Sequence, residues 1–157
     1  MSSVRVLVVE DHPPFRQFIC FTLGTRPNLQ VIGEASDGLE AVQKAEELKP
    51  DLILLDIGLP TLNGIEAARQ IRKLAPESKI LFVSQESSAD LVQEALSLGA
   101  WGYVAKTRAG SELLVAVEEV LHDRRFVGTG WEVRFADATG AQIPVRRAED
   151  HSQLRSG

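Results

Sequence analysis

The stretch Asp51-Leu-Ile-Leu-Leu-Asp-Ile-Gly-Leu-Pro60 decides the fold of this chain. Its apolar run, Leu52–Leu55, is short and bounded, which is typical of a strand buried on both faces of a parallel sheet. The run delivers a carboxylate, Asp56, to the position where the strand should end. Ligands of open α/β sheets bind outside the carboxyl ends of the strands. Asp56 is therefore a candidate functional residue, and the alternative is that it only caps the next helix.

Similar apolar runs occur on both sides of this stretch and alternate with helical patterns. Strands are expected at Val4–Val9, Leu29–Ala35, Leu52–Leu55, Lys79–Val83 and Trp101–Val104. After each strand, apolar residues recur at helical spacing until a Gly, a Pro or a change in texture ends the pattern. Five strand–helix repeats predict an α/β fold of the flavodoxin-like, doubly wound type. Its parallel sheet has the strand order 2-1-3-4-5, with helices on both faces.

The chain divides into a repeat-containing domain, 1–122, and a remainder, 123–157, of different texture. In the remainder, Trp131–Phe135 alternates, Asp137–Gly140 resembles a turn, and Ala141–Val145 could return. A hairpin and a flexible linker or tail are both open interpretations. The remainder shows neither two amphipathic helices nor a basic face, so no output domain is recognisable in it.

Composition and charge bear on nucleic-acid binding, disulfide formation and membrane association. The 157 residues carry a net charge of −5, which argues against direct binding of nucleic acid. Cys20 is the single cysteine, so no internal disulfide can form, as suits a reducing compartment. No basic region followed by a long apolar stretch suggests a signal or membrane segment. We expect a cytoplasmic protein that does not associate with a membrane.

Chemistry-bearing side chains follow the strands at the same expected edge of the sheet. Glu10 and Asp11 follow the first strand and Asp56 follows the third, which lies beside the first in the 2-1-3-4-5 order. Carboxylates that close need a cation, and Mg²⁺ suits a site with few carboxylates and a phosphate. Ser84 and Lys106 follow the fourth and fifth strands and so reach the same edge. These are the groups needed to place a phosphoryl group on Asp56.

Taken together, these positions carry a family resemblance over about residues 4–122. The residues are Glu10-Asp11, Asp56 in Leu-Leu-Asp-Ile-Gly-Leu-Pro, Asn63-Gly64, Ser84, Gly99-Ala100, Tyr103 and Lys106. The pattern resembles the receiver domain of two-component response regulators. The pair Lys106-Thr107 resembles the sequence at this point in the branch whose members usually carry a helix-turn-helix output domain. Many other receivers have Lys-Pro at this point.

The resemblance implies a role for each of the matching residues. Asp56 corresponds to the phosphoacceptor, and Lys106 to the lysine that pairs with it. The ligands of Mg²⁺ would be Glu10, Asp11, Asp56 and the backbone carbonyl of Gly58. Ser84 corresponds to the switch hydroxyl that turns toward the phosphoryl group. Tyr103 corresponds to the aromatic whose inward or outward rotamer reports activation, and strand alternation places Trp101 on the same face as Tyr103.

The implied function is a signalling switch that a sensor histidine kinase or a phosphotransfer protein phosphorylates. The surface of the fourth helix, fifth strand and fifth helix is the usual output and homodimer surface of the family. Gly58 has no side chain to block attacking water, and Glu86 places an acid near Ser84, so both are expected to set the lifetime of phospho-Asp56.

In this switch, self-phosphorylation and autodephosphorylation without an external substrate would not make the chain an enzyme. Two other interpretations differ in output or in chemistry. The chain could also be a piece of a DNA-binding regulator without its output domain. A phosphatase with an aspartyl nucleophile, similar to the haloacid-dehalogenase family, would need a second acid where Gly58 stands.

Overall fold

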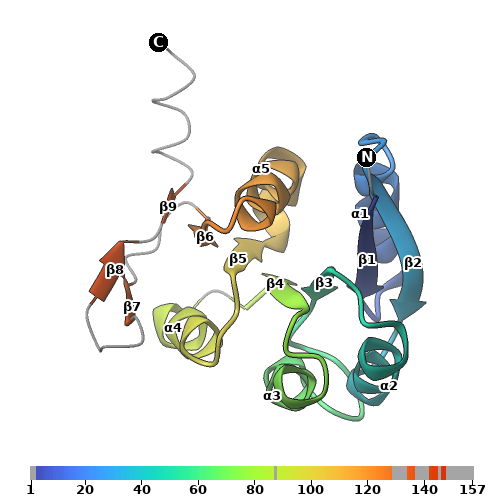
Figure 1. The fold of residues 1–157 in the computed structure, drawn as a ribbon, viewed down its shortest axis with the longest axis horizontal. Coiled ribbons are helices and arrows are strands. Elements are labelled where there is room, and N and C mark those ends of the chain that lie inside the picture. Colours follow the sequence, from blue (N-terminus) through green and yellow to red (C-terminus); the bar gives the residue numbers. More distant parts are fainter. Residues whose placement is uncertain (1–2, 87, 129–133, 137–141, 145, 148–157) are drawn as a thin grey trace.

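A computed structural model describes residues 3–86, 88–128, 134–136, 142–144 and 146–147 (Figure 1). The strands are β1 (Val4–Val9), β2 (Leu29–Ala35), β3 (Leu52–Leu55), β4 (Lys79–Ser84), β5 (Gly102–Ala105), β6 (Phe126–Val127), β7 (Arg134–Ala136), β8 (Gln142–Pro144) and β9 (Arg146–Arg147). The helices are α1 (Pro13–Leu23), α2 (Gly38–Leu48), α3 (Gly64–Leu74), α4 (Ala89–Ser97), a 3₁₀ turn η1 (Lys106–Arg108) and α5 (Ala109–Leu121).

The main sheet has the strand order β2-β1-β3-β4-β5-β6-β9, and every neighbouring pair is parallel. The expected order 2-1-3-4-5 is thus confirmed, and β1 lies beside β3. The sheet also continues by two strands beyond the expected five, since β6 pairs with β5 and β9 pairs with β6. Parallel pairing requires crossover connections, which the intervening helices supply between β1 and β6.

Alternating residues of the strands separate two hydrophobic cores, one on each face of the sheet. On one face, Leu7, Ile53 and Phe82 pack with apolar residues of α2, α3 and α4. On the other, Val8 and Leu54 pack with residues of α1 and α5. Figure 1 shows this division, with α1 and α5 on one side of the sheet and the remaining three helices on the other. The central strands are therefore apolar on both faces, and polar side chains can enter only at their ends.

Side chains fix where α2 and α3 begin. Asp37 precedes α2 and accepts a hydrogen bond from the Glu40 amide at 2.8 Å. Asn63 precedes α3 and accepts one from the Glu66 amide at 3.0 Å. Each bond satisfies an amide that the helix itself leaves without a partner. Because Asn63 performs this capping, Asp56 is left for another role.

The C-terminal part of the chain contains a second, two-stranded sheet among the described residues. Strands β7 and β8 pair antiparallel, with Phe135 opposite Ile143. Trp131 and Val133, which belong to the alternating pattern of the sequence, lie outside the described residues.

The expected orientation of Trp101 is wrong. Trp101 packs with the α1 and α5 core, whereas Tyr103 is buried in the α2–α4 core. Trp101 precedes β5, which begins at Gly102, so the strict alternation of a strand does not extend to it. Two cations flank its ring: Lys79 Nζ lies 4.4 Å and Arg125 Cζ 3.9 Å from the centroid.

Among the residues that the structure describes, no helix combines the length and the apolar character that a membrane-spanning segment needs.

Candidate functional site

An acidic cluster lies where β1 and β3 end side by side. The Asp56 amide donates to the Val9 carbonyl at 3.2 Å, which fixes the end of β3 against β1. Carboxylate oxygens of Glu10, Asp11 and Asp56 all lie within 4.8 Å of one another. Glu10 is 1% and Asp56 5% exposed, whereas Asp11 is exposed at the rim. The expected meeting of the three acids is therefore present in the structure.

Lys106 neutralises the two buried acids of the cluster. It is the first residue of η1, directly after β5, and its Nζ lies 2.8 Å from Asp56 Oδ2 and 2.7 Å from Glu10 Oε1. Burial would lower the pKa of Lys106, but its hydrogen bonds and ion pairs with Asp56 and Glu10 raise it above the usual value. Its ammonium therefore stays protonated at neutral pH and holds both carboxylates.

Glu10 is the acid that burial affects most clearly. Desolvation raises its pKa above the usual range, and the charge of Asp56 adds to this. The Lys106 ammonium and the His12 amide, which donates to Glu10 Oε2 at 2.9 Å, act in the opposite direction. A further positive charge close to Glu10 would favour its ionised form.

Backbone contacts also hold Asp56, through the carboxylate oxygen that Lys106 does not contact. Asp56 Oδ1 accepts a hydrogen bond from the Ile57 amide at 2.7 Å, and the Gly64 amide donates to the Ile57 carbonyl at 2.7 Å. The start of α3 lies so close that a Cβ on Gly64 would stand 1.9 Å from the Asp56 carbonyl oxygen. Gly64 is therefore required by the approach of α3 to the candidate phosphoacceptor.

A chain of polar contacts runs from the end of β4 to β5. Ser84 is 1% exposed, and its Oγ accepts a hydrogen bond from the Glu86 amide at 3.2 Å. The Glu86 carbonyl in turn accepts one from the Tyr103 hydroxyl at 2.8 Å. Tyr103 points inward, fully buried, with its ring centroid 6.0 Å from that of Phe82. Burial raises the pKa of Tyr103 to about 12, so the hydroxyl remains a donor.

The residues at the open side of the cluster fit a hard cation with oxygen ligands. Three carboxylates converge there, two of them buried, and carboxylate oxygens suit Mg²⁺ or Ca²⁺ better than softer metals. A Cβ built on Gly58 would meet no atom within 4 Å, so the approach beside Asp56 is open. Glu86 is exposed on the neighbouring loop, at the rim of the site.

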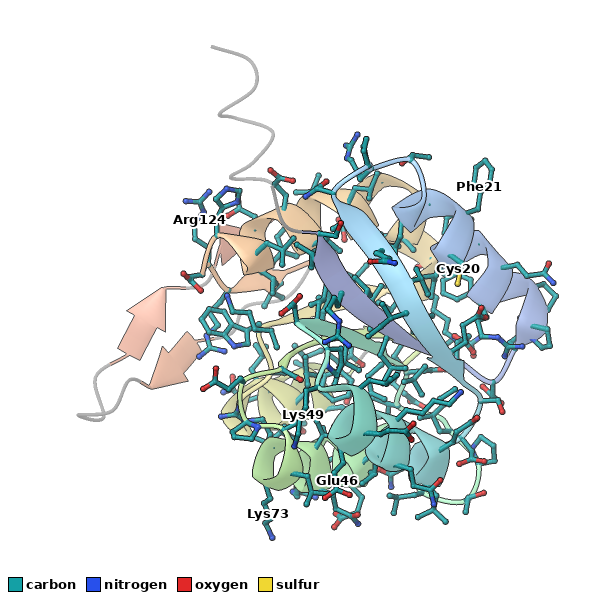
Figure 2. All side chains as sticks on the ribbon, turned by 45° about the vertical axis from the view of Figure 1, so that its right-hand side comes forward. Cys20, Phe21, Glu46, Lys49, Lys73 and Arg124 are labelled. Atoms are coloured by element: carbon teal, nitrogen blue, oxygen red, sulfur yellow. The ribbon has the colours of Figure 1, made fainter. Side chains whose placement is uncertain are left out.

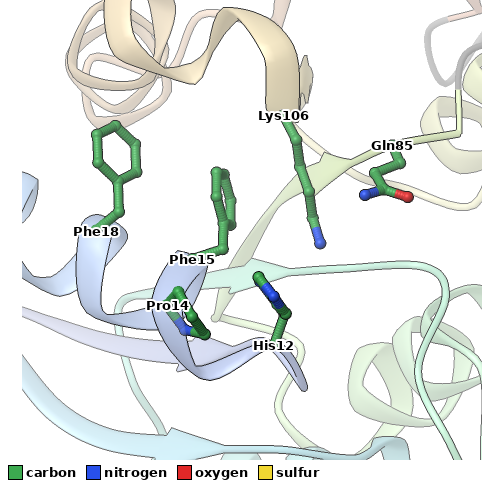
Figure 3. Close-up of a pocket in the computed structure, with 6 residues that line it drawn as sticks. All are labelled: His12, Pro14, Phe15, Phe18, Gln85 and Lys106. Carbon is green, nitrogen blue, oxygen red and sulfur yellow. The ribbon is translucent and has the colours of Figure 1, made fainter.

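Sequence reasoning missed an apolar wall beside Lys106. A pocket of about 370 Å³ lies there, and Figure 3 shows its lining residues, which are His12, Pro14, Phe15, Phe18, Gln85 and Lys106. The Phe15 ring lies under the Lys106 ammonium, with Nζ 5.0 Å from the centroid, and so shields the ion pairs from one side. The order Asp11-His12-Pro13-Pro14-Phe15 contained a signal for this wall, because a helix that starts directly after the acid pair must bring its first turn to the site.

Comparisons with known proteins agree with this geometry. Residues 6–118 match the family model of the response regulator receiver domain. The response regulator protein VraR of Staphylococcus aureus is 38% identical over 117 residues, which are 74% of this chain and 56% of that protein. The chain thus spans about half the length of the curated relatives it matches.

Solved structures give the same result for the fold. The signal receiver domain of the response regulator NarL from Mycobacterium tuberculosis is 31% identical, with a TM-score of 0.74 over 79% of this chain and 100% of that one. A LuxR-family two-component response regulator from Aurantimonas sp. SI85-9A1 is 29% identical, with a TM-score of 0.75 over 99% of this chain and 100% of that one. By sequence, fold and comparison, the chain belongs to the response regulator receiver domain family.

Proposed function

We propose that this chain is a phosphorylation-dependent switch in which Asp56 accepts a phosphoryl group from a histidine kinase or a phosphotransfer protein. The observation that carries the proposal is the position of the Asp56 carboxylate. It is buried at the end of a central strand, 2.8 Å from the Lys106 ammonium and within 4.8 Å of the carboxylates of two other acids. A carboxylate held in this way is a nucleophile of known type for phosphoryl transfer.

In the proposed transfer, an Oδ atom of Asp56 forms a bond to phosphorus as the bond from phosphorus to the donor nitrogen breaks. The electron pair of the broken bond stays on the leaving imidazole. Glu10, Asp11, Asp56 and the Gly58 carbonyl would hold Mg²⁺, which when bound would supply positive charge to the phosphoryl oxygens. The Lys106 ammonium is placed to stabilise the negative charge of the same oxygens, because it already contacts Asp56 Oδ2.

Ser84 and Tyr103 would convert the new charge into a change of surface. The Ser84 hydroxyl now accepts from the Glu86 amide, and it would turn to donate to a phosphoryl oxygen on Asp56. That turn removes the acceptor of the Glu86 amide and frees the loop that holds the Tyr103 hydroxyl. In this proposal the domain acts on itself and on its phosphodonor, and it turns over no external substrate.

The test is incubation of the full chain with acetyl phosphate and Mg²⁺, followed by intact mass measurement. We expect a single phosphate adduct that is absent in Asp56→Asn and absent when EDTA removes the metal. Asp51→Asn is the matched control, since Asp51 precedes the same strand but lies exposed at its other end, where it accepts from the Arg5 amide. An adduct that persists in Asp56→Asn, or that is lost equally in Asp51→Asn, contradicts the proposal.

We also propose that Gly58 and Glu86 set the lifetime of the phosphorylated state. The space beside Gly58 is open, and Glu86 is exposed at the rim, so water can reach the phosphoryl group between them. Gly58→Asn and Glu86→Ala should each change the rate at which the adduct decays after removal of acetyl phosphate. Equal decay rates in both variants and in the unaltered chain would rule the idea out.

A further inference from the structure

The backbone of Glu10 is held from two sides. Its amide donates to the Ala35 carbonyl, at the end of β2, at 3.0 Å. Its carbonyl accepts a hydrogen bond from Arg16 Nη1, in α1, at 2.7 Å. Both bonds use main-chain atoms of Glu10, so they are separate from the ion pair between its side chain and Lys106. Together they fix the peptide bond that joins Glu10 to Asp11.

The position of Asp11 depends on this peptide bond. Asp11 is exposed, and its carboxylate accepts no hydrogen bond from any residue that the structure describes. Pro13 and Pro14 begin α1, and neither has an amide that could donate to an acid at the start of the helix. The Asp11 carboxylate, an expected ligand of Mg²⁺, is therefore positioned by its backbone and not by side-chain contacts of its own.

Arg16 is held in turn by β2. Its Nε donates to Glu34 Oε1 at 3.1 Å, and Glu34 directly precedes Ala35 in the strand. The planar guanidinium thus joins the Glu34 carboxylate to the Glu10 carbonyl in a fixed geometry that an ammonium would not provide. The Arg16 side chain is 22% and the Glu34 side chain 52% exposed. Since an ion pair this exposed adds little to stability, its main consequence is the orientation of the guanidinium.

The face of α1 that carries Arg16 lies against β2. Cys20 is one helical turn after Arg16 and is half-buried against the α1 and α5 core. Figure 2 shows Cys20 on the side of α1 that faces β2, whereas Phe21, which is 78% exposed, points away from the sheet. Burial raises the pKa of the Cys20 thiol, and the charge of Glu34 raises it further while that of Arg16 lowers it. The two charged groups therefore meet at the packed contact between α1 and β2.

We infer that Arg16 is a positioning residue of the proposed Mg²⁺ site: held by Glu34, it fixes the backbone that places the Asp11 carboxylate. This inference rests on the proposed function. The charge of Arg16 would act in the opposite direction, because a positive charge near the acids repels the cation. Removal of that charge alone should strengthen Mg²⁺ binding, whereas loss of the position of Asp11 should weaken it. The two effects of replacing Arg16 therefore differ in sign.

Calorimetric titration of the full chain with MgCl₂ tests the inference. Arg16→Met removes both hydrogen bonds of the guanidinium and keeps an unbranched side chain. We expect the Kd for Mg²⁺ to rise about tenfold, the lower end of the loss that follows removal of a group behind a metal ligand. Arg26→Met is the matched control, with the same change of charge at an exposed residue beyond the other end of α1, and its Kd should stay within about twofold of the unaltered chain. Binding by Arg16→Met that is as tight as in the unaltered chain, or tighter, overturns the inference.

Two variants of Glu34 test the support of Arg16 and remove the same charge. Glu34→Gln keeps an oxygen that can accept from Arg16 Nε, whereas Glu34→Ala removes it. We expect the Kd for Mg²⁺ to be about threefold higher in Glu34→Ala than in Glu34→Gln, because one hydrogen bond is lost. Equal values in the two variants contradict the inference.

Labelling with acetyl phosphate separates a lost position from general damage to the fold. Because Arg16 acts through a metal ligand, the Mg²⁺ concentration that gives half the maximal labelling rate should rise about tenfold in Arg16→Met, and an excess of Mg²⁺ should restore the rate. A labelling rate that no concentration of Mg²⁺ restores would count against the inference. An unaltered chain that takes up neither Mg²⁺ nor phosphate overturns the proposed function instead.

Discussion

Replacing Gly64 with alanine should move the candidate phosphoacceptor. The added Cβ would stand 1.9 Å from the Asp56 carbonyl oxygen and 2.7 Å from the Ile57 Cα, both of them backbone atoms. Since such atoms rarely approach closer than about 3.0 Å, the start of α3 and the end of β3 must separate by roughly 1.1 Å, the difference between 3.0 and 1.9. No side-chain rotation can relieve this contact. Overpacking of this kind typically costs about 1–3 kcal/mol, and we expect the upper end of that range.

The same displacement should impair phosphorylation. A misplacement of about 1 Å at a reacting group can slow a reaction roughly 100-fold. We therefore expect Gly64→Ala to lower the rate of adduct formation with acetyl phosphate by about that factor, measured by intact mass over time. The free energy of unfolding, from urea titration followed by tryptophan fluorescence, should fall by about 3 kcal/mol.

Gly110→Ala is the matched control for this prediction. Gly110 lies in α5, and a Cβ at this position would meet no atom within 4 Å. Its stability should stay within about 1 kcal/mol of the unaltered chain, because alanine is at least as favourable as glycine in a helix. A Gly64→Ala protein with the stability and the labelling rate of Gly110→Ala would refute the argument that α3 fixes the position of Asp56.

Three other predictions concern the ion pairs, the sixth strand and the buried phenol. Lys106→Met leaves two buried acids without their cation and should lower the free energy of unfolding, from urea titration, by about 3 kcal/mol. Lys44→Met, in an exposed ion pair, should lower it by less than about 1 kcal/mol. Equal losses in the two variants would contradict the assigned ion pairs. Phe126→Ala should lower the free energy of unfolding by about 3–5 kcal/mol, while Phe21→Ala, at a side chain 78% exposed, should change it by less than about 0.5; a small loss at Phe126 would mean that β6 does not belong to the core. Because the folded pKa of Tyr103 is raised to about 12, its contribution to stability is complete below the unfolded pKa near 10 and is lost as pH rises toward 12. The unaltered chain should therefore lose up to about 1.4 kcal/mol per pH unit more than Tyr103→Phe in this window, and absorbance of the single tyrosine should show its delayed ionisation; parallel losses in the two proteins would disprove it.

The positions of the central strands were predictable because each strand is an apolar run bounded by polar or turn residues. Burial on both faces makes such runs nearly independent of their context, as at Leu52–Leu55, where all four residues are buried. Strand β6 could not be found in this way. Two apolar residues between Arg125 and Gly128 show no periodicity, and their burial depends on contacts with Trp101 and Tyr103 that are distant in sequence.

The acids and the lysine of the candidate site were predictable from their positions at strand ends. In a parallel sheet these ends share one edge, so Asp56 and Lys106 meet although they are 50 residues apart. The Phe15 wall and the orientation of Trp101 were not predictable from strand ends. They depend on side-chain directions at a helix start and at a bend before a strand, where neither helical nor strand alternation applies.

The burial of Phe126 and Val127 determines where this receiver domain can be cut and fused to another domain. A receiver domain can be fused to a different output domain only if the fusion junction leaves the receiver domain complete. A fusion junction at the end of α5 would remove β6, which pairs with β5. The edge of β5 would then carry unpaired backbone groups, which are a template for unwanted strand pairing. A fusion junction after Gly128 would keep these backbone groups paired and would retain the hydrogen bond from the Gly128 amide to the Tyr103 carbonyl. The portable unit of this receiver therefore includes the short strand after its last helix.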